Sequence, residues 1–228
     1  MIKFRSDMTV ELIDSMGDDQ SIVRAARVSS GSASEPDKDK GLINYLMRDR
    51  HGSPFEHAVF TWRIEAPIFV FREFMRHRVA SYNEESGRYK QLEPVFYVPD
   101  ENRKLIQVGK PGAYTFEDGT EEQLNLTRMA VKYTSLFAYD NYLNMLELGV
   151  AREVARMVLP VNIYSSMYVT MNARALMNFL SLRSLEQGKF PSFPQVEISW
   201  VADGMEEWFK LKLPETYAAF IANGRVAP

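Results

Sequence analysis

The sequence predicts an α+β fold in which helices pack on a small antiparallel sheet. Short segments rich in β-branched and aromatic residues alternate with longer segments whose apolar residues recur at helical spacing. The 228 residues suffice for one medium-sized domain with a substantial core. No internal repeat or long linker divides the chain, so we expect a single domain over residues 1–228.

Four short segments are expected to form strands. Residues 9–13 alternate between apolar and polar side chains, and residues 59–64 form a β-branched and aromatic run that ends before Pro67. Residues 95–98 and 164–170 have a similar composition.

The expected helices carry apolar residues at intervals of three and four. They cover residues 18–28, 37–50, 68–77, 121–148, 152–158, 172–185, 195–213 and 214–221. Asp18 or Asp19 is the expected N-cap of the first helix. The longest helix has an apolar stripe that we assign to the core or to a subunit interface before any cofactor: Leu136, Tyr139, Tyr142 and Leu146.

The remaining segments are expected to lack regular structure. Residues 31–37 are rich in Ser, Gly and Pro, residues 81–93 are polar, and residues 188–194 contain a glycine and two prolines. Residues 99–120 are expected to form an excursion on the surface.

Charge and hydropathy argue against several classes of protein. The formal net charge is −3, whereas a general nucleic-acid binder usually has a basic excess. No apolar run approaches the roughly 20 residues of a membrane helix, and the first residues do not resemble a signal peptide. We therefore expect a cytoplasmic protein with no nucleic-acid partner and no membrane partner.

The chain contains no cysteine, which excludes disulfides, thiolate metal sites and cysteine nucleophiles. Covalent or redox chemistry must come from other side chains or from a bound cofactor. The spacing of His51, His57 and His77 is not that of a zinc-protease helix, so no metal site is expected. His57 precedes an apolar strand and is expected to be a hydrogen-bonded structural residue.

Residues 76–89 carry too many charged side chains for a core element, because isolated buried charges are costly. One interpretation is a solvated loop with scattered ion pairs. The other is an anion site, in which arginines bind phosphate through paired hydrogen bonds and Ser86 and Gly87 complete the shell. Asn83 and Glu84 would then orient the arginines or recognise polar edges of the ligand.

The same segment resembles the signature of the flavin-dependent thymidylate synthases. The matching positions are Arg76, His77, Arg78, Ser81, Asn83, Glu84, Ser86, Arg88 and Tyr89. Residues 51–57, 151–160 and 172–183 are similar to three further motifs of that family. The resemblance runs from His51 to Arg183 and implies the fold of a thymidylate synthase-complementing protein.

The resemblance implies that the protein is a flavoprotein methyltransferase of nucleotide biosynthesis, which reductively methylates dUMP to dTMP. Methylenetetrahydrofolate would supply the carbon, FAD would carry the hydride and NADPH would act as the reductant. The reaction would use no cysteine nucleophile, which agrees with the composition. The family is homotetrameric, with each active site shared among chains.

The resemblance also implies the roles of individual residues. The implied dUMP ligands are Glu73, Phe74, Met75, Arg76, Glu84, Glu85, Ser86, Gly87, Arg88, Arg156 and Arg183. The implied FAD ligands are Ser53, Arg76, His77, Arg78, Glu84, Asn172, Ala173, Arg174 and Asn178. Arg183 is the implied catalytic residue, because a fixed cation stabilises a developing uracil anion where water is excluded.

Some of these arginines also have a structural interpretation. Arg152 and Arg156 share a helix face that could pair with neighbouring glutamates; the resemblance favours Arg156 as the nucleotide ligand and leaves Arg152 structural. For Arg183 the alternative role is a salt bridge to Glu186.

Arg174 and Asn178 share one face of the helix expected at residues 172–185. Arg183 lies roughly 180° around that helix from Arg174 at 3.6 residues per turn. The two arginines are therefore not expected to reach one ligand from one helix. This geometry fits active sites that are assembled between subunits.

The chain departs from the family pattern at residues 184–194. This segment is several residues longer than the pattern, and a histidine often placed there for flavin contact has no match. Gln187 is the residue expected in its position. The C-terminal flavin contacts are therefore where this chain could differ from its family.

Two other functions fit parts of the sequence. A flavoenzyme that kept the nucleotide site could act on a different substrate. A binding module could hold RNA or a free nucleotide on the arginine-rich loop, although the acidic net charge and the lack of a neighbouring aromatic platform argue against nucleic acid.

Overall fold

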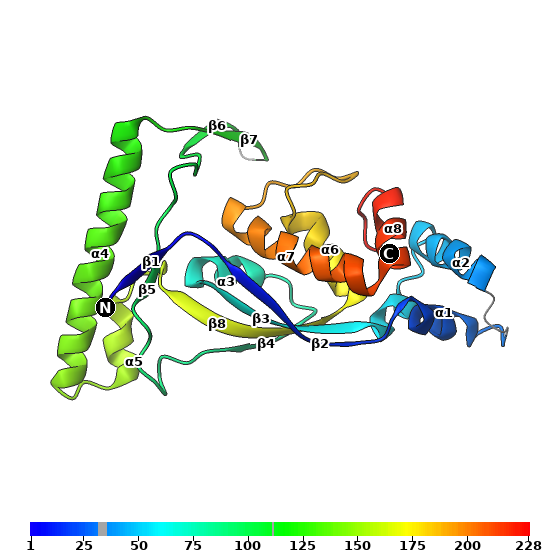
Figure 1. Ribbon diagram of the computed structural model, residues 1–228, viewed down its shortest axis with the longest axis horizontal. Coiled ribbons are helices and arrows are strands. Elements are labelled where there is room, and N and C mark those ends of the chain that lie inside the picture. The colour runs from blue at the N-terminus through cyan, green and yellow to red at the C-terminus, as the bar shows by residue number, and fades with distance from the viewer. Residues whose placement is uncertain (32–35, 111) are drawn as a thin grey trace. The chain divides into compact units, whose positions relative to one another are not determined.

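The computed structural model describes residues 1–31, 36–110 and 112–228 (Figure 1). Its strands are β1 (Lys3–Arg5), β2 (Thr9–Met16), β3 (Val59–Pro67), β4 (Ser81–Glu84), β5 (Val95–Tyr97), β6 (Ile106–Lys110), β7 (Ala113–Glu117) and β8 (Tyr164–Asn172). Its helices are α1 (Asp19–Arg27), α2 (Pro36–Arg48), α3 (Ile68–Phe74), α4 (Glu121–Glu147), α5 (Arg152–Ala155), α6 (Ala173–Arg183), α7 (Val196–Lys212) and α8 (Pro214–Ala222), with short 3₁₀ segments η1 (Ser53–His57) and η2 (Arg156–Val158).

The fold is α+β with a small antiparallel sheet, which confirms the predicted class. The four-stranded sheet has the order β2-β3-β8-β4. β1 and β5 form a separate parallel pair, and β6 and β7 form an antiparallel hairpin. Within the described residues, no helix combines the length and apolarity needed to cross a membrane.

The described chain forms two compact units. The first unit comprises Met1–Met8, Glu65–Glu73 and Glu84–Met167. The second unit comprises Thr9–Ile64, Phe74–Asn83 and Tyr168–Pro228.

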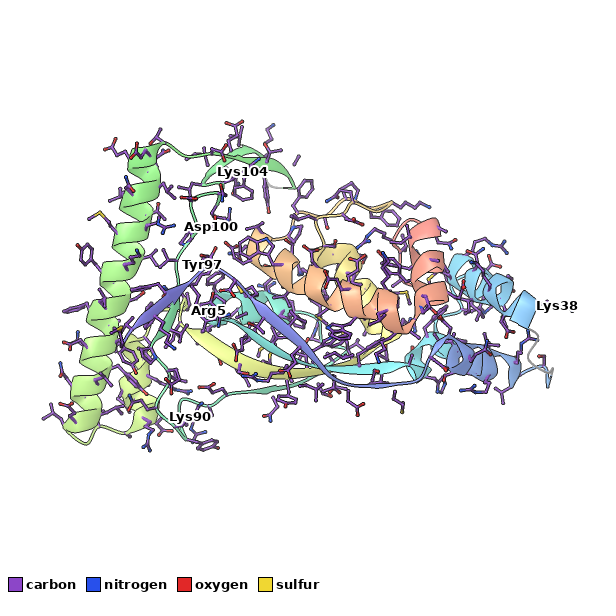
Figure 2. The ribbon with its side chains drawn as sticks, in the orientation of Figure 1. Arg5, Lys38, Lys90, Tyr97, Asp100 and Lys104 are labelled. Atoms are coloured by element: carbon purple, nitrogen blue, oxygen red, sulfur yellow. The ribbon has the colours of Figure 1, made fainter. Side chains whose placement is uncertain are left out.

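In the first unit, α4 contributes to a core that includes Leu92 and Phe96. Thr120 caps the helix, since its side chain accepts a hydrogen bond from the backbone of Gln123 in a capping box. Tyr139 and Tyr142 are buried, and their hydroxyls bond the main-chain oxygen and nitrogen of Leu92 at 2.9 and 3.2 Å. The same unit holds Arg5 of β1 (Figure 2), whose guanidinium lies 3.0 Å from Asp7.

In the second unit, α7 packs on β2 and against α6. α7 and β2 approach closely, because a Cβ added to Gly204 of α7 would lie 3.0 Å from the side chain of Val10 in β2. Phe74 and Phe179 are fully buried with ring centroids 4.5 Å apart, which fixes the start of the Arg-His-Arg triplet against α6.

The prediction of a loop at residues 81–93 is wrong for its first residues, which form β4. β4 is an edge strand, and its side chains alternate between exposed and half-buried positions. Polar residues are therefore accommodated there, because one face and one edge of the strand remain in water.

The structure also differs from the prediction at two other segments that were expected to lack regular structure. Residues 99–120 contain the β6–β7 hairpin. Of the loop expected at residues 31–37, positions 32–35 lie outside the described residues, and Pro36 and Asp37 already belong to α2.

Candidate active site

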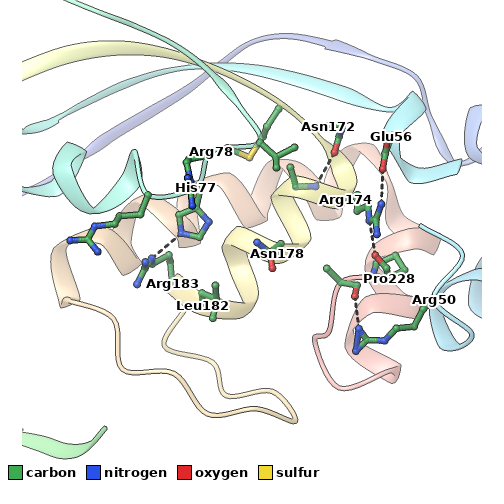
Figure 3. Close-up of a pocket in the computed structure, with 15 residues that line it drawn as sticks. Arg50, Glu56, His77, Arg78, Asn172, Arg174, Asn178, Leu182, Arg183 and Pro228 are labelled. Atoms are coloured by element: carbon green, nitrogen blue, oxygen red, sulfur yellow. Dashed lines mark hydrogen bonds and ion pairs between the residues drawn. The ribbon is translucent and has the colours of Figure 1, made fainter. Parts of the chain in front are cut away.

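The Arg-His-Arg triplet and α6 line one pocket of about 710 Å³ in the second unit (Figure 3). Its lining includes most of the implied flavin ligands and the implied catalytic residue: Arg76, His77, Arg78, Asn172, Arg174, Asn178 and Arg183. The structure therefore brings together two motifs that lie about a hundred residues apart in the sequence.

The triplet is held at both ends. α3 stops at the buried Phe74, earlier than the sequence predicts, so Arg76, His77 and Arg78 lie beyond the helix. The hydroxyl of Tyr82 donates a hydrogen bond to the main-chain oxygen of His77. Burial raises the pKa of Tyr82 to about 12, so this hydroxyl stays protonated and remains a donor.

The N-terminus of α6 is fixed by the residues that the sequence assigns to flavin. The side-chain oxygen of Asn172 caps the helix by accepting a hydrogen bond from the backbone of Ala175 at 2.9 Å. Ala173 is fully buried, and its N–H donates to the main-chain oxygen of Ala58 at 2.8 Å. Arg174 and Asn178 follow on the face that lines the pocket.

Arg183 lies at the other end of α6. Its Nε donates a hydrogen bond to Nε2 of His77 at 3.0 Å. The alternative partner suggested by the sequence, Glu186, instead accepts a hydrogen bond from Arg225 at 3.1 Å.

The expectation that Arg174 and Arg183 could not serve one site from one helix is wrong for this pocket, because both line it. The helical-wheel argument treats side chains as radial. Arg183 is the last residue of α6, and its long side chain turns toward His77 (Figure 3).

His77 is electrostatically unusual. Burial and, secondarily, the charge of Arg183 lower its pKa to about 4. The ring is therefore neutral at pH 7, and since Nε2 accepts from Arg183, the proton lies on Nδ1. Its ring packs edge-on against Phe179, with centroids 4.9 Å apart.

Arg174 is held by groups that the sequence reasoning did not identify. Its Nη1 donates to Glu56 at 2.7 Å, and its Nε donates to the main-chain oxygen of Pro228 at 2.7 Å. A Cβ on Gly52 would lie 2.4 Å from Nε of Arg174, so glycine is needed for this approach. The motif at residues 51–57 could have drawn attention to Gly52 and Glu56, whereas a main-chain contact from Pro228 has no sequence signal.

The implied phosphate ligands cluster in the first unit. Ser86 accepts a hydrogen bond from the backbone of Arg88 at 3.3 Å and starts a tight turn at the buried Gly87. A Cβ on Gly87 would lie 3.3 Å from the side chain of Arg156, so the turn and η2 are in close contact. Nε of Arg88 donates to Glu153 at 3.0 Å.

Glu84 of the signature and its neighbour Glu85 directly precede this turn. Burial raises the pKa of Glu84, while a hydrogen bond with Ser165 and the charge of Arg156 act against that rise. Glu85 pairs with Lys90 at 3.1 Å, and its backbone N–H donates to the main-chain oxygen of Ser166 at 2.8 Å.

Several implied ligands lie outside the pocket lining. Ser53 is exposed in η1, and Glu84 belongs to the first unit. Phe74 is fully buried. Glu73 belongs to the first unit, and Met75 is exposed in the second.

Gln187, the residue expected in place of a family histidine, does not line the pocket. Its side-chain amide donates to the main-chain oxygens of Leu185 and Ser192 at 3.2 Å and accepts from the backbone of Ser192 at 3.1 Å. It therefore braces its own loop. His57, expected to be a structural residue, is exposed.

The chemistry of the pocket suits a flavin dinucleotide. Arginines that line it, Arg50, Arg76, Arg78 and Arg174, can hold a diphosphate, and Val79, Met171 and Leu182 offer an apolar wall to a ring. Among the described residues, no group of three or more His, Asp or Glu side chains is arranged to hold a metal ion.

An arginine-lined pocket of this size suits the phosphates of a nucleotide or dinucleotide. Residues 11–215 match the family model described as thymidylate synthase complementing protein. The chain belongs to this family, that of the flavin-dependent thymidylate synthases.

Individual relatives match over nearly the whole chain. Proteins named flavin-dependent thymidylate synthase from Tropheryma whipplei and Streptomyces avermitilis are each 60% identical, over 99% of this chain and 97% and 95% of their own. The crystal structure of a UMP/dUMP methylase from Streptomyces cacaoi, bound with 5-Br UMP, superposes with a TM-score of 0.94. It is 48% identical and covers 100% of this chain and 99% of that one.

Proposed function

We propose that this chain methylates dUMP to dTMP, with methylenetetrahydrofolate as carbon donor, FAD as hydride carrier and NADPH as reductant. The observation that carries the proposal is the pocket in which Arg183, fixed by His77, lies with Arg174 and Asn178. The names of the relatives support the reaction, and the absence of cysteine requires a route without a thiol nucleophile.

Arg183 would act on the uracil ring. Its Nε donates to His77, and the side chain lines the pocket in which the ligand would lie. A fixed cation beside the uracil imide stabilises the anion and makes carbon five nucleophilic. Because His77 is neutral, it orients Arg183 without adding a second charge.

The turn in the first unit would hold the dUMP phosphate. Ser86, the backbone of Gly87, Arg88 and Arg156 offer donors within one small cluster. Arg88 is paired with Glu153 in the structure, and phosphate would replace that carboxylate.

The second unit would hold FAD, which would supply the hydride-transfer chemistry between NADPH and the transferred carbon. Arg76, Arg78 and Arg174 would bind the diphosphate, and Asn178 would bind polar atoms of the cofactor.

We also propose a homotetramer with active sites shared among chains. One face of α4 exposes a stripe of large apolar side chains at helical spacing: Leu126, Met129, Tyr133, Leu136 and Phe137. Between 39% and 73% of each residue's surface is exposed. A contiguous apolar stripe of this kind is typical of a subunit interface.

Product analysis tests the proposal. The purified protein is incubated with FAD, NADPH and methylenetetrahydrofolate, and with dUMP or UMP in parallel. Formation of dTMP is the expected result. Methylation of UMP alone would show that UMP, and not dUMP, is the substrate. Binding of FAD without either product would assign the chain to a different flavoenzyme class.

A further inference from the structure

Two residues beyond α8 form part of the wall of the proposed flavin pocket. Ala227 and Pro228 line the pocket, and Pro228 is buried. The main-chain oxygen of Pro228 accepts a hydrogen bond from Arg174 at 2.7 Å, and that of Ala227 accepts one from Arg50 at 3.4 Å (Figure 3). Two pocket arginines are thus held by main-chain groups of one short segment.

This segment is anchored by a buried ion pair. Arg225 is 5% exposed, and its two Nη atoms reach the two carboxylate oxygens of Glu206 at 2.6 and 2.7 Å. One Nη atom also lies 3.1 Å from Glu186. Because this bidentate pair is buried, it fixes the direction of the main chain at residues 226–228.

A second anchor comes from the loop in which the chain departs from its family. The backbone N–H of Lys189 donates to the main-chain oxygen of Gly224 at 2.8 Å. A Cβ on Gly188 would lie 2.6 Å from that oxygen, so the approach needs glycine. Gln187 braces the same loop from inside, through its bonds to Leu185 and Ser192.

We propose that residues 226–228 position Arg174 for the cofactor, and that the Arg225–Glu206 pair and the loop at Lys189 hold them in place. The inference rests on the proposed flavin site. Pro228 acts through its main-chain oxygen, so it is a positioning residue.

Contacts with Glu56 and Pro228 restrict the side chain of Arg174 before any ligand binds. A free arginine side chain loses about 2 kcal/mol of rotamer entropy when a ligand fixes it. Glu56 and Pro228 fix the guanidinium through Nη1 and Nε, and other N–H groups are left for an anion. The conformational entropy of the Arg174 side chain is therefore lost during folding and not during binding, which increases the affinity for the ligand.

The experiment measures FAD affinity by flavin fluorescence in a variant that lacks Ala227 and Pro228. We expect the Kd for FAD to rise about tenfold, the loss typical of a hydrogen bond to a charged group. Pro228→Ala is the matched comparison: it keeps the main-chain oxygen, so the Kd should rise less than it does in the deletion variant. The thermal midpoint without FAD checks that the fold is retained, because the deletion leaves Arg225 and Glu206 paired.

A double-mutant cycle identifies Arg174 as the residue through which the segment acts. In an Arg174→Ala background the same deletion should change the Kd by less than about twofold, because its target is gone. Equal losses in both backgrounds would overturn the inference, and so would an unchanged or lower Kd after the deletion alone. A parent chain that binds no FAD would overturn the proposed function as well, whereas normal binding by both parent and deletion variant would overturn only this inference.

Discussion

At the scale of single residues, Arg183 carries the most specific consequence. It is bonded to a neutral histidine in a pocket whose other cations are assigned to the cofactor. Arg183→Ala should lower kcat about 100- to 1,000-fold, the effect of removing one donor that stabilises a developing anion. FAD binding, followed by absorbance, should be retained.

Arg174→Ala is the matched control, since it removes a cation from the same helix and the same pocket. It should weaken FAD binding and have a smaller effect on kcat at saturating FAD. Equal kcat in Arg183→Ala and the parent would remove Arg183 from the mechanism.

His77 makes stability depend on pH. Its pKa is about 4 in the folded chain and near 6.5 when unfolded, so the unfolded state binds more protons between these values. The stability from neutral His77 is thus complete above about pH 6.5 and is lost as pH falls toward 4. Urea unfolding at pH 7 and pH 4.5 should show a loss of about 2 kcal/mol assigned to His77.

His77→Gln is the variant that isolates this effect. Glutamine does not titrate and keeps an acceptor for Arg183, so the difference in unfolding free energy between the two pH values should shrink. If the variant and the parent lose the same free energy of unfolding between pH 7 and pH 4.5, a titrating group other than His77 causes the loss.

Glu153 should compete with the substrate phosphate for Arg88. Both side chains are about half exposed, so their ion pair is weak. Glu153→Gln should therefore lower the KM for dUMP only about two- to threefold, with kcat unchanged. A higher KM in steady-state assays would show that Glu153 positions Arg88 productively.

At the scale of elements, a substitution in the apolar stripe of α4 tests whether this helix forms the interface of the proposed homotetramer. Phe137 is 73% exposed, and a charge there would be desolvated at an interface between copies. Phe137→Asp should shift the sedimentation coefficient from that of a tetramer toward smaller species. Glu147→Gln changes charge outside the stripe and should leave the sedimentation coefficient unchanged.

Element types were predictable where periodicity and caps agree. The Asp18 cap, the α4 boundaries and β3 follow the sequence closely, because apolar spacing and capping residues act locally. β4 was missed because its polarity resembles a loop, and only its place at a sheet edge explains it. The β6–β7 hairpin was missed because its strands are short and mostly exposed.

The site was predictable to a different extent. The motif match identified the residues that meet in the pocket, including Arg76, Arg174 and Arg183. It could not identify Pro228, whose contribution is a main-chain oxygen with no side-chain signature. It also could not show that Gln187 bonds within its own loop, because a match by position carries no information on side-chain contacts.

At the scale of the whole molecule, the implied phosphate ligands and the flavin pocket belong to different units of the chain. The proposed reaction requires that dUMP and FAD meet in one site. A ligand that stacks on or lies beside the flavin alters its electronic environment, so the flavin spectrum reports directly on that meeting.

The central measurement is the visible absorbance spectrum of the purified protein, recorded after addition of FAD and again after addition of dUMP. The account predicts a bound-flavin spectrum that shifts when dUMP is added. A spectrum that shows no bound flavin, or a bound flavin that does not respond to dUMP, would contradict it.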